Sequence, residues 1–449
     1  MTPRVRMSPR AKRVAIPLAL LAVLAGAGLG ATGAFDPGAG ASADHSLPPS
    51  GRSGVCLKSV APTVLSTLGV VAMHVYHEGI SSERTGAALH FVTNSAPLRE
   101  AVERGDAPAT LAAAQALIAT GHLTNLEVIG AGAAAEGGGK VLANVGPAEA
   151  LTPLHGTIVG AHGVPIATFV ASVWTDNGFI SEADGITEGA VVLRAHGHSI
   201  AGSFALPPGE LPAHGTLTER GVAYRYTSFP ATAFPTGSLR VYLLRSIAST
   251  TALCGPSAQD TVVHTLSRVA SLIYKAEAGS HALAQLHGVQ LDSALLQAVA
   301  ARDRAATRKA VIGVVYAGTH VVRLRVLAPD GSVLSDVGGP DVLAPVRAPL
   351  LLHGRTIGSV VLSVQDDRGY LLLARRLVGL RVVMYENASH PRVVMSSFQT
   401  APAGIPAEGK FRYEGQNYRV FTLHAEAFPS GPLRISVLIP IPYTSSPTP

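Results

Sequence analysis

The chain has 449 residues, of which 47% are hydrophobic and 14% are charged. This length suits two domains, and this composition excludes a largely disordered chain. Residues 1–43 hold five basic residues and one acidic residue, so the net charge of +6 falls to +2 without them. A nearly neutral remainder argues against nucleic acid as a partner.

The N-terminal segment 1–43 has the layout of a secretory signal peptide. Its basic residues end at Arg13, an uncharged apolar stretch runs from Val14 to Ala34, and Ala41-Ser42-Ala43 offers a cleavage site. The apolar stretch also fits an uncleaved membrane anchor. Either alternative predicts an extracytoplasmic protein of a bacterial-type cell, secreted or anchored by this segment.

The rest of the chain contains an internal duplication, which is the feature to seek first in any sequence. FPTGSLR at 234–240 matches FPSGPLR at 428–434, and LANVG at 142–146 matches LSDVG at 334–338. Further short matches keep the same order at a nearly constant offset, which chance similarity does not produce. The sequence therefore predicts two copies of one domain.

The predicted division of the chain follows from this duplication. Its parts are a signal peptide or membrane anchor at 1–43, a linker at 44–60, a first domain at 61–250, a linker at 251–261, a second domain at 262–441 and a disordered tail at 442–449. No second long apolar stretch follows the first, so we expect no cytoplasmic output domain in this chain.

Each copy begins with an amphipathic helix, marked by apolar residues at helical spacing. The two stripes are Val64, Leu68, Val71 and Val75 in the first copy and Val262, Leu266, Val269 and Ile273 in the second. A second helical stretch is expected at 96–119 and at 293–316. The remaining residues favour strands, as in the hairpin around Pro329-Asp330-Gly331. The predicted fold class is α+β, with an antiparallel sheet and helices packed on one side in each copy.

These features resemble the Cache superfamily of PAS-like extracytoplasmic sensor domains. The resemblance rests on the opening helices, on LLQAV at 295–299, on the 329–331 hairpin, and on TIGSVVLS at 356–363 leading into DDRGY at 366–370. It implies two tandem domains that capture a small molecule under the central sheet of one or both copies. The family usually passes its signal through a transmembrane helix to a cytoplasmic output domain, which this chain is not expected to contain. A membrane or envelope protein is therefore a candidate partner.

Aromatic and basic side chains are the candidates for lining such a pocket, although packing or solvation explains each of them as well. The candidates are Trp174, Tyr224, Arg225, Tyr370, Arg381, Tyr385, Tyr418 and Arg419. Because neighbouring residues of a strand face opposite sides, Tyr418 and Arg419 are not expected to point into the same cavity.

The chain has two cysteines, Cys56 and Cys254, which bracket the first copy. Export permits a disulfide between them, which would tie the two ends of that copy together. The alternative is a pair of free thiols. The second copy has no equivalent pair.

Three further patterns suggest chemistry but have simpler explanations. Gly197-His198-Ser199-Ile200-Ala201 falls short of a nucleophile elbow and is not followed by a helical pattern. His196 and His198 have a spacing that suits a metal, but no carboxylate cluster lies near them in the sequence. Asp366-Asp367 fits a helix start better than an acid/base pair. We therefore predict no catalytic residue, no metal and no cofactor.

Two functions follow from these observations, and a third is less favoured. The first is an extracytoplasmic sensor or binding protein for a small molecule. The second is a cell-envelope interaction or scaffold protein that uses the same fold without a small ligand. The least favoured is an exported serine hydrolase, because it would need Ser199 beside a histidine and a carboxylate.

Overall fold

The computed structural model describes residues 60–120, 123–131, 139–146, 149–316, 321–386 and 392–443. The predicted signal or anchor segment 1–43, nearly all of the linker 44–60 and most of the tail 442–449 lie outside these ranges. No helix within them is long and apolar enough to cross a membrane. Both repeats belong to one compact unit.

The first repeat begins with four helices, continues with two groups of strands separated by a helix, and ends with a short connecting helix. Its helices are α1 (Ala61–Ser81), α2 (Glu83–Thr93), α3 (Ala96–Glu103), α4 (Ala107–Ala119), α5 (Asp176–Thr187) and α6 (Ile247–Ala252). Its strands are β1 (Asn125–Gly130), β2 (Val141–Val145), β3 (Ala150–Leu151), β4 (Leu154–Val159), β5 (Pro165–Ser172), β6 (Trp174–Thr175), β7 (Ala190–Ala195), β8 (His198–Gly202), β9 (His214–Glu219), β10 (Val222–Phe234) and β11 (Gly237–Ser246).

The second repeat has the same order of elements. Its helices are α7 (Ala258–Ala276), α8 (Ser280–Leu291), α9 (Ser293–Ala300), α10 (Arg304–Tyr316) and α11 (Asp367–Val378). Its strands are β12 (Arg323–Leu327), β13 (Val333–Gly338), β14 (Val342–Leu343), β15 (Val346–Leu352), β16 (Arg355–Ser363), β17 (Gln365–Asp366), β18 (Arg381–Glu386), β19 (Arg392–Ser396), β20 (Gly409–Tyr413), β21 (Gln416–Phe428) and β22 (Gly431–Ile441).

The two repeats share one sheet topology, as the predicted duplication requires. A four-stranded sheet has the order β2-β1-β5-β4 in the first repeat and β13-β12-β16-β15 in the second. A larger sheet has the order β6-β3-β10-β11-β7-β8, and its counterpart is β17-β14-β21-β22-β18-β19. The strands β9 and β20 pair with β10 and β21. The α+β class in two tandem copies is therefore confirmed.

The strands of each repeat are divided between two sheets, whereas the sequence suggested one sheet per copy. The chain leaves the smaller sheet at Ser172 in the first repeat and at Ser363 in the second, and both serines are fully buried. The Ser172 hydroxyl donates to the Leu151 carbonyl and accepts from the Trp174 N–H at 3.1 Å. The serine hydroxyl thus makes hydrogen bonds to backbone groups that a neighbouring strand would otherwise make, and the residues that follow it join the other sheet.

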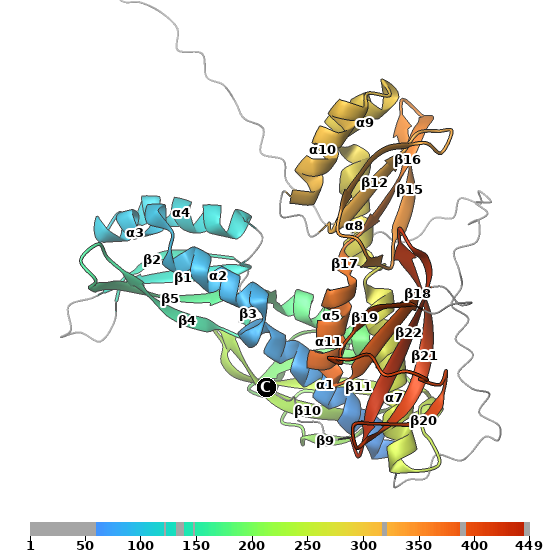
Figure 1. The fold of residues 1–449 in the computed structure, drawn as a ribbon. Helices are drawn as coiled ribbons and strands as arrows, with labels where there is room; N and C mark the ends of the chain where they lie inside the picture. Colours follow the sequence, from blue (N-terminus) through green and yellow to red (C-terminus); the bar gives the residue numbers. More distant parts are fainter. Residues whose placement is uncertain are drawn as a thin grey trace, which may run out of the picture. The chain divides into compact units, whose positions relative to one another are not determined.

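Helices cover one face of each sheet (Figure 1). Helices α2, α3 and α4 pack on the small sheet of the first repeat, and α8, α9 and α10 pack on that of the second. The large sheets pack against α1, α5, α7 and α11. Residues 203–213 and 397–408 cover the other faces of the large sheets.

The predicted opening helices are confirmed, and the second helical stretch is broken in two. Val64, Leu68 and Val71 of α1 are at most 2% exposed, as their spacing predicts. The stretch 96–119 is interrupted at Gly105, which has a φ of 63°. Asp106 then caps α4 by accepting from the Ala109 N–H at 3.0 Å, because a short carboxylate competes well for free N–H groups at a helix start.

The two repeats share one hydrophobic core. It contains Val71 and Phe179 from the first repeat together with Val269 and Tyr370 from the second. Helix α1 contacts α7 and α11, and α5 contacts α7. Since α1 and α5 correspond to α7 and α11, the repeats exchange equivalent contacts as the halves of a two-fold interface do.

Candidate functional site

Two of the predicted pocket residues lie where the helices of the two repeats meet. Tyr370 is fully buried in the shared core, and its hydroxyl donates to the Ala270 carbonyl at 3.1 Å. Trp174 is half-buried and borders a small, mostly apolar cavity of about 220 Å³ together with Leu373 and Leu377. Packing explains the position of both aromatic rings.

Three more of these residues lie on the opposite face of the large sheet in the second repeat. Tyr385 and Tyr418 belong to a compact cluster beneath residues 397–408. Arg381 donates to the Ser397 carbonyl at 3.0 Å, and its guanidinium lies 5.6 Å from the centre of the Phe398 ring. These side chains hold the covering segment in place.

The remaining candidates are a pair of positions that correspond between the repeats. In the first repeat, the ring of Tyr224 packs edge-on against that of Phe204, with 4.8 Å between the ring centres. Arg225 is half-buried in β10. In the second repeat, Arg419 donates to the Asp260 carboxylate at 2.8 Å. Arg419 therefore faces α7, whereas Tyr418 packs in the cluster on the opposite face of the sheet, as strand alternation requires.

Arg419 borders two adjoining cavities, which we call the α7–β21 cleft. The first, of about 330 Å³, lies between one face of α7, residues 407–409 and residues 419–424 of β21. The second, of about 720 Å³, lies between the start of α7 and the β20–β21 hairpin. Cavities of this size suit a small ligand.

Polar side chains line one face of α7 along this cleft. His264, Ser267, Arg268 and Ser271 all border the first cavity, and their spacing places them on one side of the helix. Across the whole cleft, four basic side chains accompany two acidic ones: Lys410, Arg412, Arg419 and Arg268 with Asp260 and Glu408. The cleft therefore has an excess of positive charge.

The first turn of α7 holds Asp260 in position for its contact with Arg419. Ser257 is the N-cap of α7 and accepts from the Asp260 N–H at 3.1 Å. Its hydroxyl donates to the Asp260 carboxylate at 2.7 Å. The Asp260–Arg419 ion pair therefore joins the start of α7 to the middle of the cleft.

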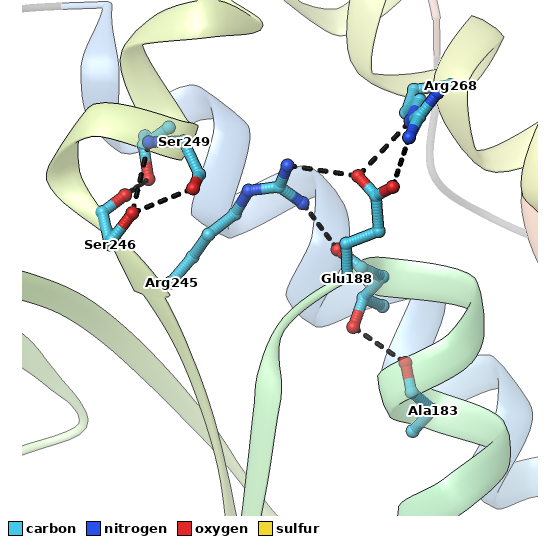
Figure 2. Close-up of polar contacts among 8 residues, drawn as sticks. Ala183, Glu188, Arg245, Ser246, Ser249 and Arg268 are labelled. Carbon is cyan, nitrogen blue, oxygen red and sulfur yellow. Dashed lines mark hydrogen bonds and ion pairs between the residues drawn. The ribbon is translucent and has the colours of Figure 1, made fainter. Parts of the chain in front are cut away.

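Arg268 joins the cleft to the first repeat. Its Nε donates to the Glu188 carboxylate at 3.1 Å, and its terminal nitrogen makes a second, shorter bond to the same group. Figure 2 shows Glu188 between Arg268 and Arg245, whose terminal nitrogens donate to Glu188 at 3.2 Å and to the Thr187 carbonyl at 2.6 Å. Burial acts to raise the pKa of Glu188, but the hydrogen bonds and charges of the two arginines lower it overall.

The equivalent region of the first repeat is closed. Tyr76 and Tyr274 occupy corresponding positions in the two opening helices. Gly69 and Ser267 lie equally far before them, so these two positions also correspond. A side chain at Gly69 would begin 2.8 Å from the Thr227 methyl group of β10, so α1 lies directly on that strand. In the second repeat α7 stands away from β21, and the space between them is the first cavity of the cleft.

Most of the cleft was not predicted from the sequence, although the duplication contained a signal for it. At corresponding positions, Ser66 is replaced by His264 and Val70 by Arg268 in the second repeat. Two copies of one fold should differ mainly where their surroundings differ. Ser66 is exposed in α1, so the informative change is at the partly buried Val70, where an arginine in the second repeat marks a local opening.

The other candidate motifs lie outside the cleft. Ser199 is exposed in β8 and pairs with Arg194, so a strand follows the turn instead of the helix that a nucleophile elbow requires. Among the described residues there is no group of three metal-binding side chains, around His196 and His198 or elsewhere. Cys56 lies outside the described residues, so the predicted disulfide with Cys254 stays a prediction.

The aspartate pair at 366–367 begins a helix, as predicted. Asp366 is the N-cap of α11 and accepts from the Gly369 N–H at 2.6 Å. In the first repeat Thr175 accepts from the Gly178 N–H at 2.8 Å. The capping residues are thus Thr175 and Asp366, both of types that serve as an N-cap, and not Asp176 and Asp367, the aspartates that follow them in the two repeats.

Comparison with known proteins adds a general likeness. No family model and no curated protein matches the chain. A solved structure of an extracellular ligand binding receptor from Desulfohalobium retbaense DSM5692 is similar at 11% sequence identity and a TM-score of 0.25. The match covers 52% of this chain and 47% of that one, so the chain spans about half the length of the receptor. A likeness at this level assigns neither a family nor a ligand.

Proposed function

We propose that this protein is an extracytoplasmic binding protein for a small molecule with an anionic group, and that the α7–β21 cleft of the second repeat is its site. One observation carries the proposal: the same position in the duplicated fold is closed in the first repeat and open in the second. Arg268 and Arg419 border this opening, and Lys410 and Arg412 border the adjoining cavity; a cleft with convergent polar groups is the usual form of a ligand site.

The proposed protein lies outside the cytoplasm and binds its ligand without catalysing a reaction. The layout of residues 1–43 supports export, and the identity of the N-terminus of the protein purified from its host distinguishes a cleaved signal peptide from an anchor. The cleft is lined by arginines, a lysine and histidines, of which Arg419 and Arg268 are held by carboxylates, and this set of donors suits binding of an anion.

A thermal-shift screen of the purified protein tests the proposal. The library contains carboxylates, amino acids, purines, sugars and, as cationic competitors, polyamines. A ligand at about 100 times its dissociation constant stabilises the protein by roughly 2.7 kcal/mol, so a rise in melting temperature is readily measured. We expect the rise with anionic compounds and not with polyamines.

A matched pair of variants locates the site. Arg419→Gln removes a charge from the cleft, and Arg225→Gln removes the corresponding charge from the first repeat. We expect the first variant to lose the ligand-induced shift and the second to keep it. Equal loss in both variants, or no shift with any compound, would favour the envelope interaction protein instead.

A further inference from the structure

One edge of β21 has no strand beside it over part of its length. Strand β20 pairs with residues 416–420, and β14 pairs with residues 427 and 428. Between them, no described strand lies against this edge. Residues 421–424 of the same stretch border the first cavity of the cleft.

The hydrogen bonds of Glu426 show which backbone groups face this edge. Its N–H donates to the Tyr274 hydroxyl at 2.8 Å, and its carbonyl accepts from the Ala344 N–H at 3.2 Å. Every second residue of a strand directs its N–H and carbonyl to the same edge. His424 and Thr422 therefore present their backbone groups to the cleft side.

The first repeat has the same edge but lacks a donor there. Thr232, the counterpart of Glu426, bonds to Tyr76 and Thr152 in the same manner. Two residues before it lies Pro230, which corresponds to His424 and has no N–H. Proline is a usual means of protecting an exposed strand edge from pairing. The second repeat lacks this protection at the place where its cleft is open.

We propose that the ligand of the α7–β21 cleft is a short extended peptide with a carboxylate, which pairs as an added strand with Thr422 and His424. This inference rests on the proposed function and specifies its ligand. Peptides commonly bind to a free sheet edge in this way, with main-chain bonds for affinity and neighbouring pockets for side chains. The edge selects an extended backbone, and the basic residues beside it select an acidic group.

The surroundings of the edge fit this ligand. The Thr422 hydroxyl donates to the Ala407 carbonyl at 2.7 Å, which holds the segment before β20 without using the Thr422 backbone. The His424 side chain is exposed and leaves the edge accessible. The larger cavity beyond Arg419, with Lys410 and Arg412, provides room and charge for the carboxylate.

Affinity selection from a random heptapeptide library, displayed on phage and applied to the whole protein, tests the proposal. The selected peptide is synthesised, and its affinity is measured by calorimetry for the wild type, His424→Pro and His424→Ala. His424→Pro recreates the first repeat and removes one N–H, so binding should weaken by about tenfold or more. His424→Ala keeps the N–H and should remain within about threefold of the wild type.

A second measurement avoids any change in the protein. Methylation of single peptide nitrogens should abolish binding at alternate positions only, since one side of an added strand faces β21. Failure to select any peptide, or equal affinities for the proline and alanine variants together with an absence of alternation, would overturn the proposal. Binding of small anions that depends on Arg419 but not on His424→Pro would leave the proposed function standing and remove this inference alone.

Discussion

Glu277, the residue that follows α7, is a weaker acid than an ordinary glutamate. Burial raises its pKa to about 7, and the charge of Glu182 on α5 acts in the same direction. Its ionisation therefore disfavours the folded state, because the unfolded chain loses the same proton near its usual pKa of 4.5. Ionisation of Glu277 should weaken the contact between the repeats, since Glu182 and Glu277 come from different repeats and their negative charges repel.

Glu277→Gln should remove a pH-dependent loss of stability. In the wild type, the folded state holds this proton above the unfolded pKa, so stability falls as the pH rises from 4.5 to about 7. The variant should match the wild type at a pH of roughly 4 and exceed it by ~1–3 kcal/mol at a pH of roughly 8. Urea unfolding at both pH values measures this, and a constant difference would contradict it.

At the scale of elements, the spacing between helix and strand distinguishes the two repeats. The duplication and the apolar stripes made the helices and many of the strands predictable, because Val64 or Leu266 is buried by any sheet that covers its helix. The cleft was not predictable in this way. It depends on how far α7 stands from β21, and the contacts that α7 makes, such as that of Arg268 with Glu188, join residues remote in sequence.

The pair Gly69 and Ser267 tests this difference. Gly69→Leu should cost about 2 kcal/mol or more, because the new side chain meets Thr227 and overpacks the helix against the strand. Ser267→Leu should cost less than about 1 kcal/mol, because it enters the first cavity, and it should block ligand binding. Denaturant unfolding and the thermal-shift assay measure the two effects, and equal destabilisation would refute the comparison.

At the scale of the whole molecule, the polar contact at Glu188 secures one repeat to the other. The side chain of Arg245 is 7% exposed, so removal of its carboxylate partner leaves a buried charge. Glu188→Ala should therefore cost ~2–4 kcal/mol. Glu386→Ala, which breaks a more exposed pair with Arg392, is the control and should cost less than about 1 kcal/mol. Chemical unfolding of both variants gives the comparison.

The predicted disulfide acts at the same scale. A bond between Cys56 and Cys254 would close a loop of roughly 200 residues and stabilise the first repeat by up to about 5 kcal/mol in the chain-entropy estimate. Intact-mass measurement with and without a thiol-blocking reagent detects the bond, and reduction should lower the melting temperature. Two alkylated thiols in the untreated protein would show that the bond is absent.

Arg268 belongs to two contacts at once, because it borders the cleft and also donates both of its bonds to Glu188. On the proposed function, an anion in the first cavity that bonded to the guanidinium nitrogens now held by Glu188 would compete with that carboxylate. Thermodynamic linkage makes such competition reciprocal. The factor by which such a ligand would weaken the contact between Arg268 and Glu188 would equal the factor by which that contact weakens the ligand, so a single side chain would couple the cleft to the first repeat.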